Sequence, residues 1–165
     1  MARIAVYPAS LDPIHFGHID IAVRATHIFD HVIVAVYVTP KKNVLFSVAE
    51  RVALAEKCFE GYNNIEVAFF SGLAVNYVQQ VGAIAIVRGL RVFGDFEFEF
   101  RMGMANKKLA PNVETVAILA DEKFMHISSS TVREIAELGG NVTSMVPPHV
   151  AQALTERYGI HQSDS

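Results

Sequence analysis

The sequence has a single cysteine, little net charge and no long apolar run, and each shortage excludes a class of protein. Cys58 cannot form an internal disulfide, and we interpret it as a small buried apolar residue in a predicted helix. A formal net charge of −3 gives no reason to expect a nucleic-acid surface. The longest apolar runs, such as residues 32–38, are far shorter than a membrane span. Because no charged-then-apolar leader opens the chain, we expect a cytoplasmic protein that binds neither nucleic acid nor membrane.

Size and composition predict one folded domain. The chain has 165 residues, of which 52% are hydrophobic and 19% charged, and this balance favours a buried core over disorder. We see no repeat or linker, so we expect a single domain over residues 1–165. The last residues, 160–165, are expected to form a frayed polar tail.

Apolar runs bounded by turns alternate with helix-like segments. The β-branched, nearly continuous runs predict strands at residues 3–7, 31–38, 65–70, 83–87 and 115–120. Helical spacing and caps predict helices around residues 21–29, 48–60, 73–81, 95–100, 130–138 and 148–159. This alternation predicts an α/β fold, a doubly wound five-stranded parallel sheet with C-terminal helices.

The segment DFEFEF at residues 95–100 fits two structures. Its period-two alternation alone predicts a strand, whereas Phe93, Phe96, Phe100 and Met104 form a helical seam. We predict a helix because it completes the strand–helix alternation. The phenylalanines, Phe98 included, are interpreted as core residues or as contacts between subunits.

Two loops lie where a sheet of this kind binds ligands, at the carboxyl ends of its strands. In the first, PASLDPIHFGH, His15 and His18 flank Gly17 at the start of a helix, whose free N–H groups favour an anion. Two imidazoles there suit a triphosphate and the charge that grows during phosphoryl transfer. The alternative is that one histidine caps or packs while the other is exposed. Zinc is disfavoured because no Cys or spaced carboxylate supplies further ligands.

Other segments offer basic and hydroxyl groups. Arg88 directly follows the strand at 83–87, where an arginine suits a phosphate better than a core. Three consecutive serines at 128–130 precede a helix and exceed what one N-cap needs. Lys42 and Glu99, taken alone, have an alternative interpretation as solvated surface residues.

The segment YPASLDPIHFGH resembles the (T/H)-x-G-H signature of the nucleotidyltransferase superfamily. RGLR (88–91), DFEFE (95–99), ISSSTVRE (127–134) and NVTSMVPPHV (141–150) are similar to the bacterial phosphopantetheine adenylyltransferase family, and the likeness extends nearly end to end. The resemblance implies a Rossmann-like nucleotidyltransferase fold. It also implies that 4′-phosphopantetheine attacks the α-phosphorus of ATP, giving dephospho-coenzyme A and pyrophosphate in coenzyme A biosynthesis.

The resemblance implies roles for particular residues. Catalysis would rest on His18, Lys42 and Arg91. The implied ATP contacts are Ser10, Leu11, His18, Gly89, Leu90, Arg91, Glu99, Phe124, Met125, His126, Ile127, Ser128, Ser129 and Ser130. The implied contacts to phosphopantetheine are Ser10, Lys42, Ala74 and Arg88.

Magnesium and self-assembly also follow from the resemblance. A metal offsets charge on a triphosphate, so Mg²⁺ is expected to arrive with ATP. No carboxylate cluster would hold the ion unaided, and ATP is therefore expected to supply most of its ligands. The family forms homohexamers, and the phenylalanine-rich segment is compatible with subunit contacts.

The chain departs from the family at a few positions. Ala9 and Ser10 stand where the family usually has Gly and Thr, and His15 stands where Thr is common. His15 resembles the nicotinate-mononucleotide adenylyltransferases, which are the alternative enzyme, although RGLR and DFEFE argue against them. A non-catalytic nucleotide-binding module is the other alternative. It would be expected to lack His18, Lys42 or Arg88, yet all three are present.

Overall fold

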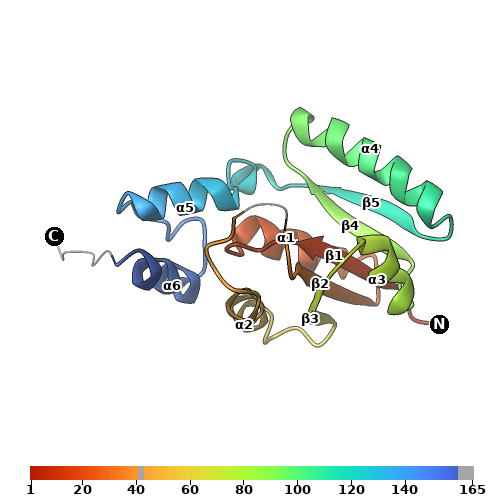
Figure 1. The fold of residues 1–165 in the computed structure, drawn as a ribbon, viewed down its shortest axis with the longest axis horizontal. Coiled ribbons are helices and arrows are strands. Elements are labelled where there is room, and N and C mark those ends of the chain that lie inside the picture. Colours follow the sequence, from red (N-terminus) through yellow and green to blue (C-terminus); the bar gives the residue numbers. More distant parts are fainter. Residues whose placement is uncertain (41–42, 160–165) are drawn as a thin grey trace.

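The computed structural model describes residues 1–40 and 43–159. Lys42, which is expected to act in catalysis, and the expected tail at 160–165 lie outside the described residues. Within that part of the chain, no helix is both long enough and apolar enough to cross a membrane. Figure 1 shows strands covered by helices, with α5 and α6 side by side at one end of the molecule.

Five parallel strands form one sheet in the order β3-β2-β1-β4-β5, which confirms the doubly wound five-stranded prediction. The strands are β1 (Ile4–Ala9), β2 (His31–Tyr37), β3 (Ile65–Phe70), β4 (Ala85–Leu90) and β5 (Glu114–Leu119). The helices are α1 (Phe16–Ala25), α2 (Val48–Cys58), α3 (Ala74–Gln80), α4 (Phe93–Leu109), α5 (Ser129–Glu137) and α6 (Pro148–Tyr158), with a short 3-10 turn at Glu122–Phe124.

The two faces of the sheet carry separate cores. Along β1, Ala5 and Tyr7 pack in one core with α1, α2, α5 and α6, whereas Val6 packs in the other core with α3. Side chains that alternate between faces are what a parallel strand buried on both sides requires. The partly buried Cys58 packs against the first core, and burial raises the pKa of its thiol to about 12. This fits the interpretation of Cys58 as a small apolar residue.

The two central strands separate before they end. β1 pairs with β2 over its whole length, but with β4 only at Ala5 and Val6. The next residue of β1 that faces β4 is Pro8, which has no N–H to donate to that strand. Its carbonyl instead accepts a hydrogen bond from Arg88 Nη1 at 3.0 Å. The gap opens at the point where the strand order reverses, so it is the place where this fold offers a ligand a crevice.

β4 runs further than the sequence predicts. The predicted strand covers 83–87, whereas the observed strand continues through Arg88, Gly89 and Leu90. These three residues pair in register with 117–119 of β5. They are therefore part of the sheet rather than of a following loop. An arginine and a glycine do not by themselves predict a strand, and it is the hydrogen bonding to β5 that extends β4 through them.

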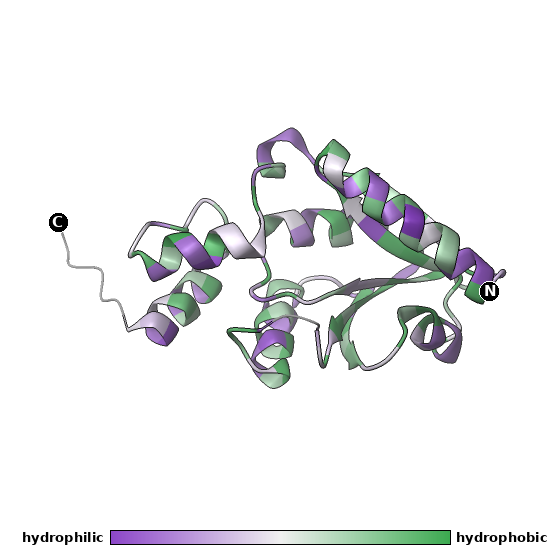
Figure 2. Ribbon diagram, turned by 45° about the horizontal axis from the view of Figure 1, so that its top comes forward, coloured by the Kyte–Doolittle hydropathy of each residue, from purple (hydrophilic) through white to green (hydrophobic). Residues whose placement is uncertain are grey.

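The segment 95–100 lies within α4, as predicted. No residue of α4 is buried, and Phe96 stacks on Phe100 one turn later. Apolar and polar residues follow one another along the ribbon of this helix (Figure 2). The interpretation of its phenylalanines as core residues is therefore wrong for this chain, since side chains such as Phe93, 96% exposed, lie outside both cores.

A buried arginine joins three segments beside the crevice. Arg51 of α2 is 1% exposed, and its guanidinium donates to the carbonyls of Ser10, Tyr37, Val38 and Phe46 at 2.8, 2.8, 3.4 and 3.1 Å. These carbonyls belong to the end of β1, the end of β2 and the start of α2. One side chain thus fixes the strand exits against the helix.

Helix α1 starts with a reciprocal cap made by two imidazoles. His15 Nδ1 accepts from the Gly17 N–H at 3.0 Å, and His18 Nδ1 accepts from the His15 N–H at 3.1 Å. Burial lowers the pKa of His15 to about 3, with a smaller effect from the charge of Arg91. His15 is therefore neutral near pH 7 and acts as a cap, which is the alternative foreseen for one of the two histidines.

The cap makes stability depend on pH. An unfolded histidine has a pKa near 6.5, so below that pH the unfolded chain binds a proton that folded His15 does not. We expect His15 to lower the free energy of unfolding by up to about 1.4 kcal/mol per pH unit between about pH 6.5 and 3. Asparagine is a capping residue that does not titrate, so His15→Asn should make the free energy of unfolding depend less steeply on pH than in wild type. Urea unfolding at several values between about pH 3 and 6.5 measures this dependence. Equal slopes would contradict the assignment, and His27→Asn on the surface serves as the control.

Candidate active site

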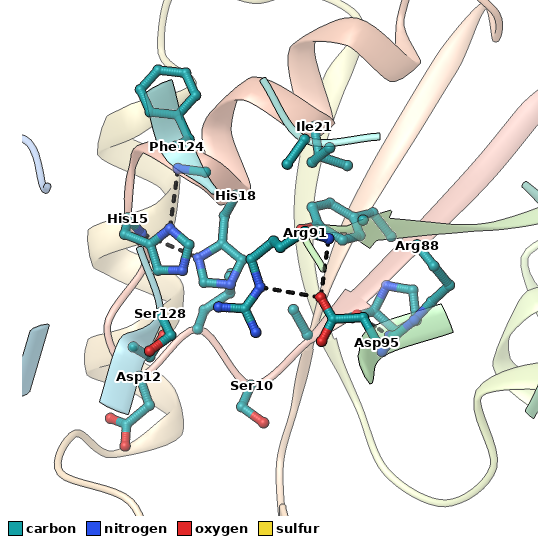
Figure 3. Close-up of a pocket in the computed structure, with 18 of the residues that line it drawn as sticks. Ser10, Asp12, His15, His18, Ile21, Arg88, Arg91, Asp95, Phe124 and Ser128 are labelled. Atoms are coloured by element: carbon teal, nitrogen blue, oxygen red, sulfur yellow. Dashed lines mark hydrogen bonds and ion pairs between the residues drawn. The ribbon is translucent and has the colours of Figure 1, made fainter. Parts of the chain in front are cut away.

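A cavity of about 340 Å³ opens at the carboxyl ends of β1 and β4, where the strands separate. Its wall comes from β1 and the following loop, from the end of β4 and the start of α4, and from the start of α5. Figure 3 shows His18, Arg91 and Asp95 around this space, together with Ser10 and Ser128. Segments far apart in the sequence thus meet at the edge that the sequence analysis identified.

His18 faces the cavity from the first turn of α1. Its ring stacks on His15, with the centroids 3.7 Å apart and the planes 29° from parallel. Because its Nδ1 accepts the His15 N–H, a neutral His18 ring carries its proton on Nε2. The cap therefore fixes both the orientation and the tautomer of the imidazole, and a fixed N–H donor suits the stabilisation of a phosphate oxygen.

Two glycines in the cavity wall lie where a side chain would crowd a neighbour. A Cβ on Gly17 would lie 2.8 Å from Cε1 and 2.9 Å from Nδ1 of His15, so any side chain there would displace the capping ring. A Cβ on Gly89 would lie 3.2 Å from Cγ1 of Ile21, so the missing side chain lets α1 pack closely on β4. Gly17 thus leaves room for the cap of the helix that carries His18, and Gly89 keeps that helix close to the strand that carries Arg88.

Arg88 is held by an acid on α4. Its Nε and Nη2 donate to the two carboxylate oxygens of Glu99 at 2.8 and 2.7 Å. Burial acts to lower the pKa of Arg88, but the hydrogen bonds and charge of Glu99 outweigh that effect and leave the pKa raised. The guanidinium stays charged at the mouth of the crevice, where an incoming phosphate would meet it.

Arg91 and Arg133 are also paired with acids. Arg91 Nε lies 3.4 Å from Asp95, whose carboxylate also accepts the Arg91 N–H at 3.0 Å, and Arg91 Nη1 donates to the Ile127 carbonyl at 2.9 Å. Arg133 of α5 lies 3.7 Å from the Asp12 carboxylate. Each pocket arginine is therefore oriented before any substrate arrives, which reduces the entropy lost on binding.

Ser10 and the serines of α5 offer hydroxyls to the cavity. Leu11 adopts a φ of 51°, an uncommon conformation for a non-glycine residue, and it directly follows Ser10 in the wall. Ser128 caps α5 through Thr131 N, and Ser129 donates to the Pro13 carbonyl at 2.9 Å. Ser130 is exposed and lines the cavity. All three serines thus line the cavity, while Ser128 also caps α5 and Ser129 also binds the Pro13 carbonyl.

The structure brings most of the predicted residues to one cavity. The predicted residues that line this cavity are Ser10, Leu11, His18, Arg88, Gly89, Arg91, Glu99, Phe124, Ser128, Ser129 and Ser130. Outside the lining are Leu90, Ala74 at the start of α3, the exposed Met125 and His126, and Ile127, whose side chain is fully buried. The ligand contacts expected of all these residues stay predictions.

Sequence reasoning missed several residues of the wall. Asp95 lies one helical turn before Glu99, and this spacing on a predicted helix was a signal that could have identified it. Arg133, which also lines the cavity, lies in the predicted helix that follows the three serines. Tyr7 and Tyr37 line the cavity from the ends of their strands, and burial raises the pKa of Tyr7 to about 12. An aromatic residue in a buried strand carries no sequence signal that separates a cavity wall from a core.

The acids of the cavity are engaged by protein groups. Asp12 accepts from the N–H groups of Leu45 and Phe46 at 2.8 and 2.9 Å, while Asp95 and Glu99 pair with arginines. In residues 1–40 and 43–159, no group of three His, Cys, Asp or Glu side chains could hold a metal ion.

Known proteins resemble this chain along most of its length. The cytidylyltransferase-like family model matches residues 6–135. Phosphopantetheine adenylyltransferases of Roseiflexus sp. and Desulforamulus reducens are each 50% identical, over 94% and 95% of this chain and 98% of each relative. A crystal structure from Vibrio parahaemolyticus, of a protein assigned to the nicotinate-nucleotide adenylyltransferases, matches with a TM-score of 0.71 at 18% identity, covering 93% of this chain and 99% of that one; it shows the fold alone. The chain belongs to the phosphopantetheine adenylyltransferase family of cytidylyltransferase-like proteins.

Proposed function

We propose that this chain transfers the adenylyl group of ATP to 4′-phosphopantetheine, giving dephospho-coenzyme A and pyrophosphate, as a cytoplasmic step of coenzyme A biosynthesis. The observation that carries the proposal is the meeting of His18, Arg88 and Arg91 in one cavity at the gap between β1 and β4. The names of relatives that are half identical over nearly the whole chain support the same substrate.

The chemistry requires alignment and charge stabilisation more than proton transfer. An oxygen of the 4′-phosphate attacks the α-phosphorus of ATP, the bond from that phosphorus to the β-bridging oxygen breaks, and pyrophosphate leaves. The attacking phosphate is already an anion, so no general base is needed. The protein must hold two polyanions in line and offset their repulsion, which matches a cavity rich in guanidinium and imidazole donors.

The expected roles follow from position in the crevice. His18 would donate to the α-phosphate and stabilise the transition state, together with Arg91 and with Lys42, which lies outside the described residues. Ser10, which follows the end of β1 and lines the cavity, would contact both ATP and phosphopantetheine. Arg88 would bind the phosphate of phosphopantetheine through its guanidinium.

Magnesium would enter as the complex with ATP, which is the form in which the nucleotide is a substrate. The engaged carboxylates of Asp12, Asp95 and Glu99 support this assignment. The phosphates would supply most of the ligands of the ion, and its charge would offset that of the leaving pyrophosphate.

An acceptor assay tests the proposal. We expect pyrophosphate release from ATP and Mg²⁺ in the presence of phosphopantetheine, and no release with nicotinate mononucleotide. Release with only nicotinate mononucleotide would identify the alternative enzyme, to which His15 in the signature points. No release with either acceptor would indicate a non-catalytic nucleotide-binding module.

His18 can be tested without removing its structural bond. His18→Asn keeps an acceptor near the position of Nδ1 for the His15 N–H, but it lacks a donor at the position of Nε2. We expect kcat to fall by about 10²- to 10³-fold while the urea midpoint stays near that of wild type. Steady-state pyrophosphate release measures the loss, with His27→Asn as the matched control. A kcat close to wild type would remove His18 from catalysis.

We also propose that the chain assembles as a homohexamer. The argument rests on α4 and the β5 edge, which expose Phe93, Phe96, Phe98, Phe100, Met104, Leu109 and Leu119. An apolar surface of this extent is characteristic of a protein interface. A second copy of the chain is the occupant that the family resemblance favours.

Light scattering after size-exclusion chromatography should give six chain masses for wild type. Phe100→Glu places a charge among these apolar side chains and should shift the mass towards that of one chain, because a buried unpaired charge is costly. Leu138→Glu, at a residue that is 82% exposed away from α4, should leave the mass unchanged. A wild-type monomer would contradict the assembly.

A further inference from the structure

The cavity takes its side chains from both faces of the sheet. Tyr37 ends β2 and packs against the core that contains α3, and Arg88 follows Ile86 of that core by two residues along β4. Because the side chains of a strand alternate between faces, Arg88 lies on the α3 side as well. Gly89 lies on the other side, where a Cβ would meet Ile21 of α1. The gap between β1 and β4 therefore joins an α1 side and an α3 side of one cavity.

An aromatic stack holds Tyr37 on the α3 side. The centroid of its ring lies 4.4 Å from that of Phe70 at the end of β3, and Phe70 stacks on Tyr77 of α3 at 5.1 Å. Phe70 is buried, so the support for the Tyr37 ring is part of the core. A tyrosine side chain has only two torsions, and packing against the core restricts them. The position of the Tyr37 hydroxyl is thus set before any ligand arrives.

The fold makes no use of this hydroxyl. Within residues 1–40 and 43–159 the hydroxyl of Tyr37 has no hydrogen bond, and no buried polar side-chain atom lacks a partner, so the hydroxyl is open to the cavity that the residue lines. Partial burial raises its pKa, while the charges of Arg88 and Glu99 act on it with opposite signs. The hydroxyl is therefore protonated near pH 7 and lies within electrostatic reach of the guanidinium.

The groups expected at the α-phosphate of ATP come from the α1 side. His18 belongs to α1, and Arg91 donates to the carbonyl of Ile127, which packs in the core of that side. Tyr37 and Arg88 face the cavity from the α3 side instead. The ligand that Arg88 receives is therefore the one whose neighbouring atoms meet Tyr37.

We propose that Tyr37 is a specificity-determining residue for the acceptor, and that its hydroxyl hydrogen-bonds the polar chain that follows the phosphate bound by Arg88. The inference rests on the proposed function and adds a contact to a part of the acceptor that does not react. Phosphopantetheine carries a hydroxyl and two amides beyond its phosphate, whereas nicotinate mononucleotide carries a ribose and a pyridine ring. A fixed phenol that loses its partner weakens binding of an acceptor that lacks such a group.

Tyr37→Phe tests the inference, because it removes the hydroxyl and keeps the ring in the stack. We expect the KM for phosphopantetheine to rise about fivefold, the size of one lost hydrogen bond, and the KM for ATP to change by less than about twofold. The kcat should stay near that of wild type, since the hydroxyl does not touch the reacting atoms. Calorimetric binding of phosphopantetheine without ATP should weaken by the same factor.

Two further variants complete the test. Tyr62→Phe removes the hydroxyl of an exposed tyrosine outside the cavity wall and is the matched control. Tyr37→Leu removes the ring as well and should raise the KM for phosphopantetheine further. The urea midpoint of each variant shows that the chain remains folded under the assay conditions.

The outcomes separate the alternatives. A KM for phosphopantetheine that is unchanged in Tyr37→Phe would overturn the inference, and so would a rise in the KM for ATP alone. A wild-type chain that releases no pyrophosphate with phosphopantetheine contradicts the proposed function. Active variants at Tyr37 that keep the wild-type KM values contradict the role of this residue alone.

Discussion

The separation of β1 from β4 is the constraint on which the rest of the site depends. Parallel strands normally pair along their length, and these two do so only at Ala5 and Val6. Pro8 offers β4 no N–H, and the guanidinium of Arg88 occupies the side of β1 that would otherwise pair. The same residue that interrupts the ladder therefore accepts a hydrogen bond from a side chain that lines the cavity. The crevice is a consequence of backbone chemistry at one position in the central strand.

Around this gap, the arginines of the cavity are paired with carboxylates, and these pairs fix the orientation of their N–H donors. Three arginines each face a carboxylate, while His15 is held neutral by burial and caps the helix that carries His18. Without these partners, a cluster of cations would repel itself and its long side chains would lose substantial entropy on binding. The site is organised before substrate enters, and such organisation is an efficient way to stabilise charge that develops in a reaction.

Local signals made much of this predictable, and long-range geometry accounts for the rest. The helices predicted around residues 48–60 and 95–100 are present, because caps and helical spacing are properties of neighbouring residues. The end of β4 was placed too early, since pairing with β5 carries the strand through Arg88 and Gly89. The family resemblance supplied Glu99 as an ATP contact. Its pairing with Arg88 is visible only in three dimensions, because β4 and α4 must first be folded against each other.

Arg51 couples the strand ends beside the crevice to one another. Its guanidinium is shared by the ends of β1 and β2 and the start of α2, and within residues 1–40 and 43–159 no carboxylate accepts a hydrogen bond from it. If any one of these segments opened alone, the buried guanidinium would lose a hydrogen bond, which costs about 1.5–3 kcal/mol when one partner is charged. Separate fraying of one segment is thereby disfavoured, and amide exchange in the three segments is coupled.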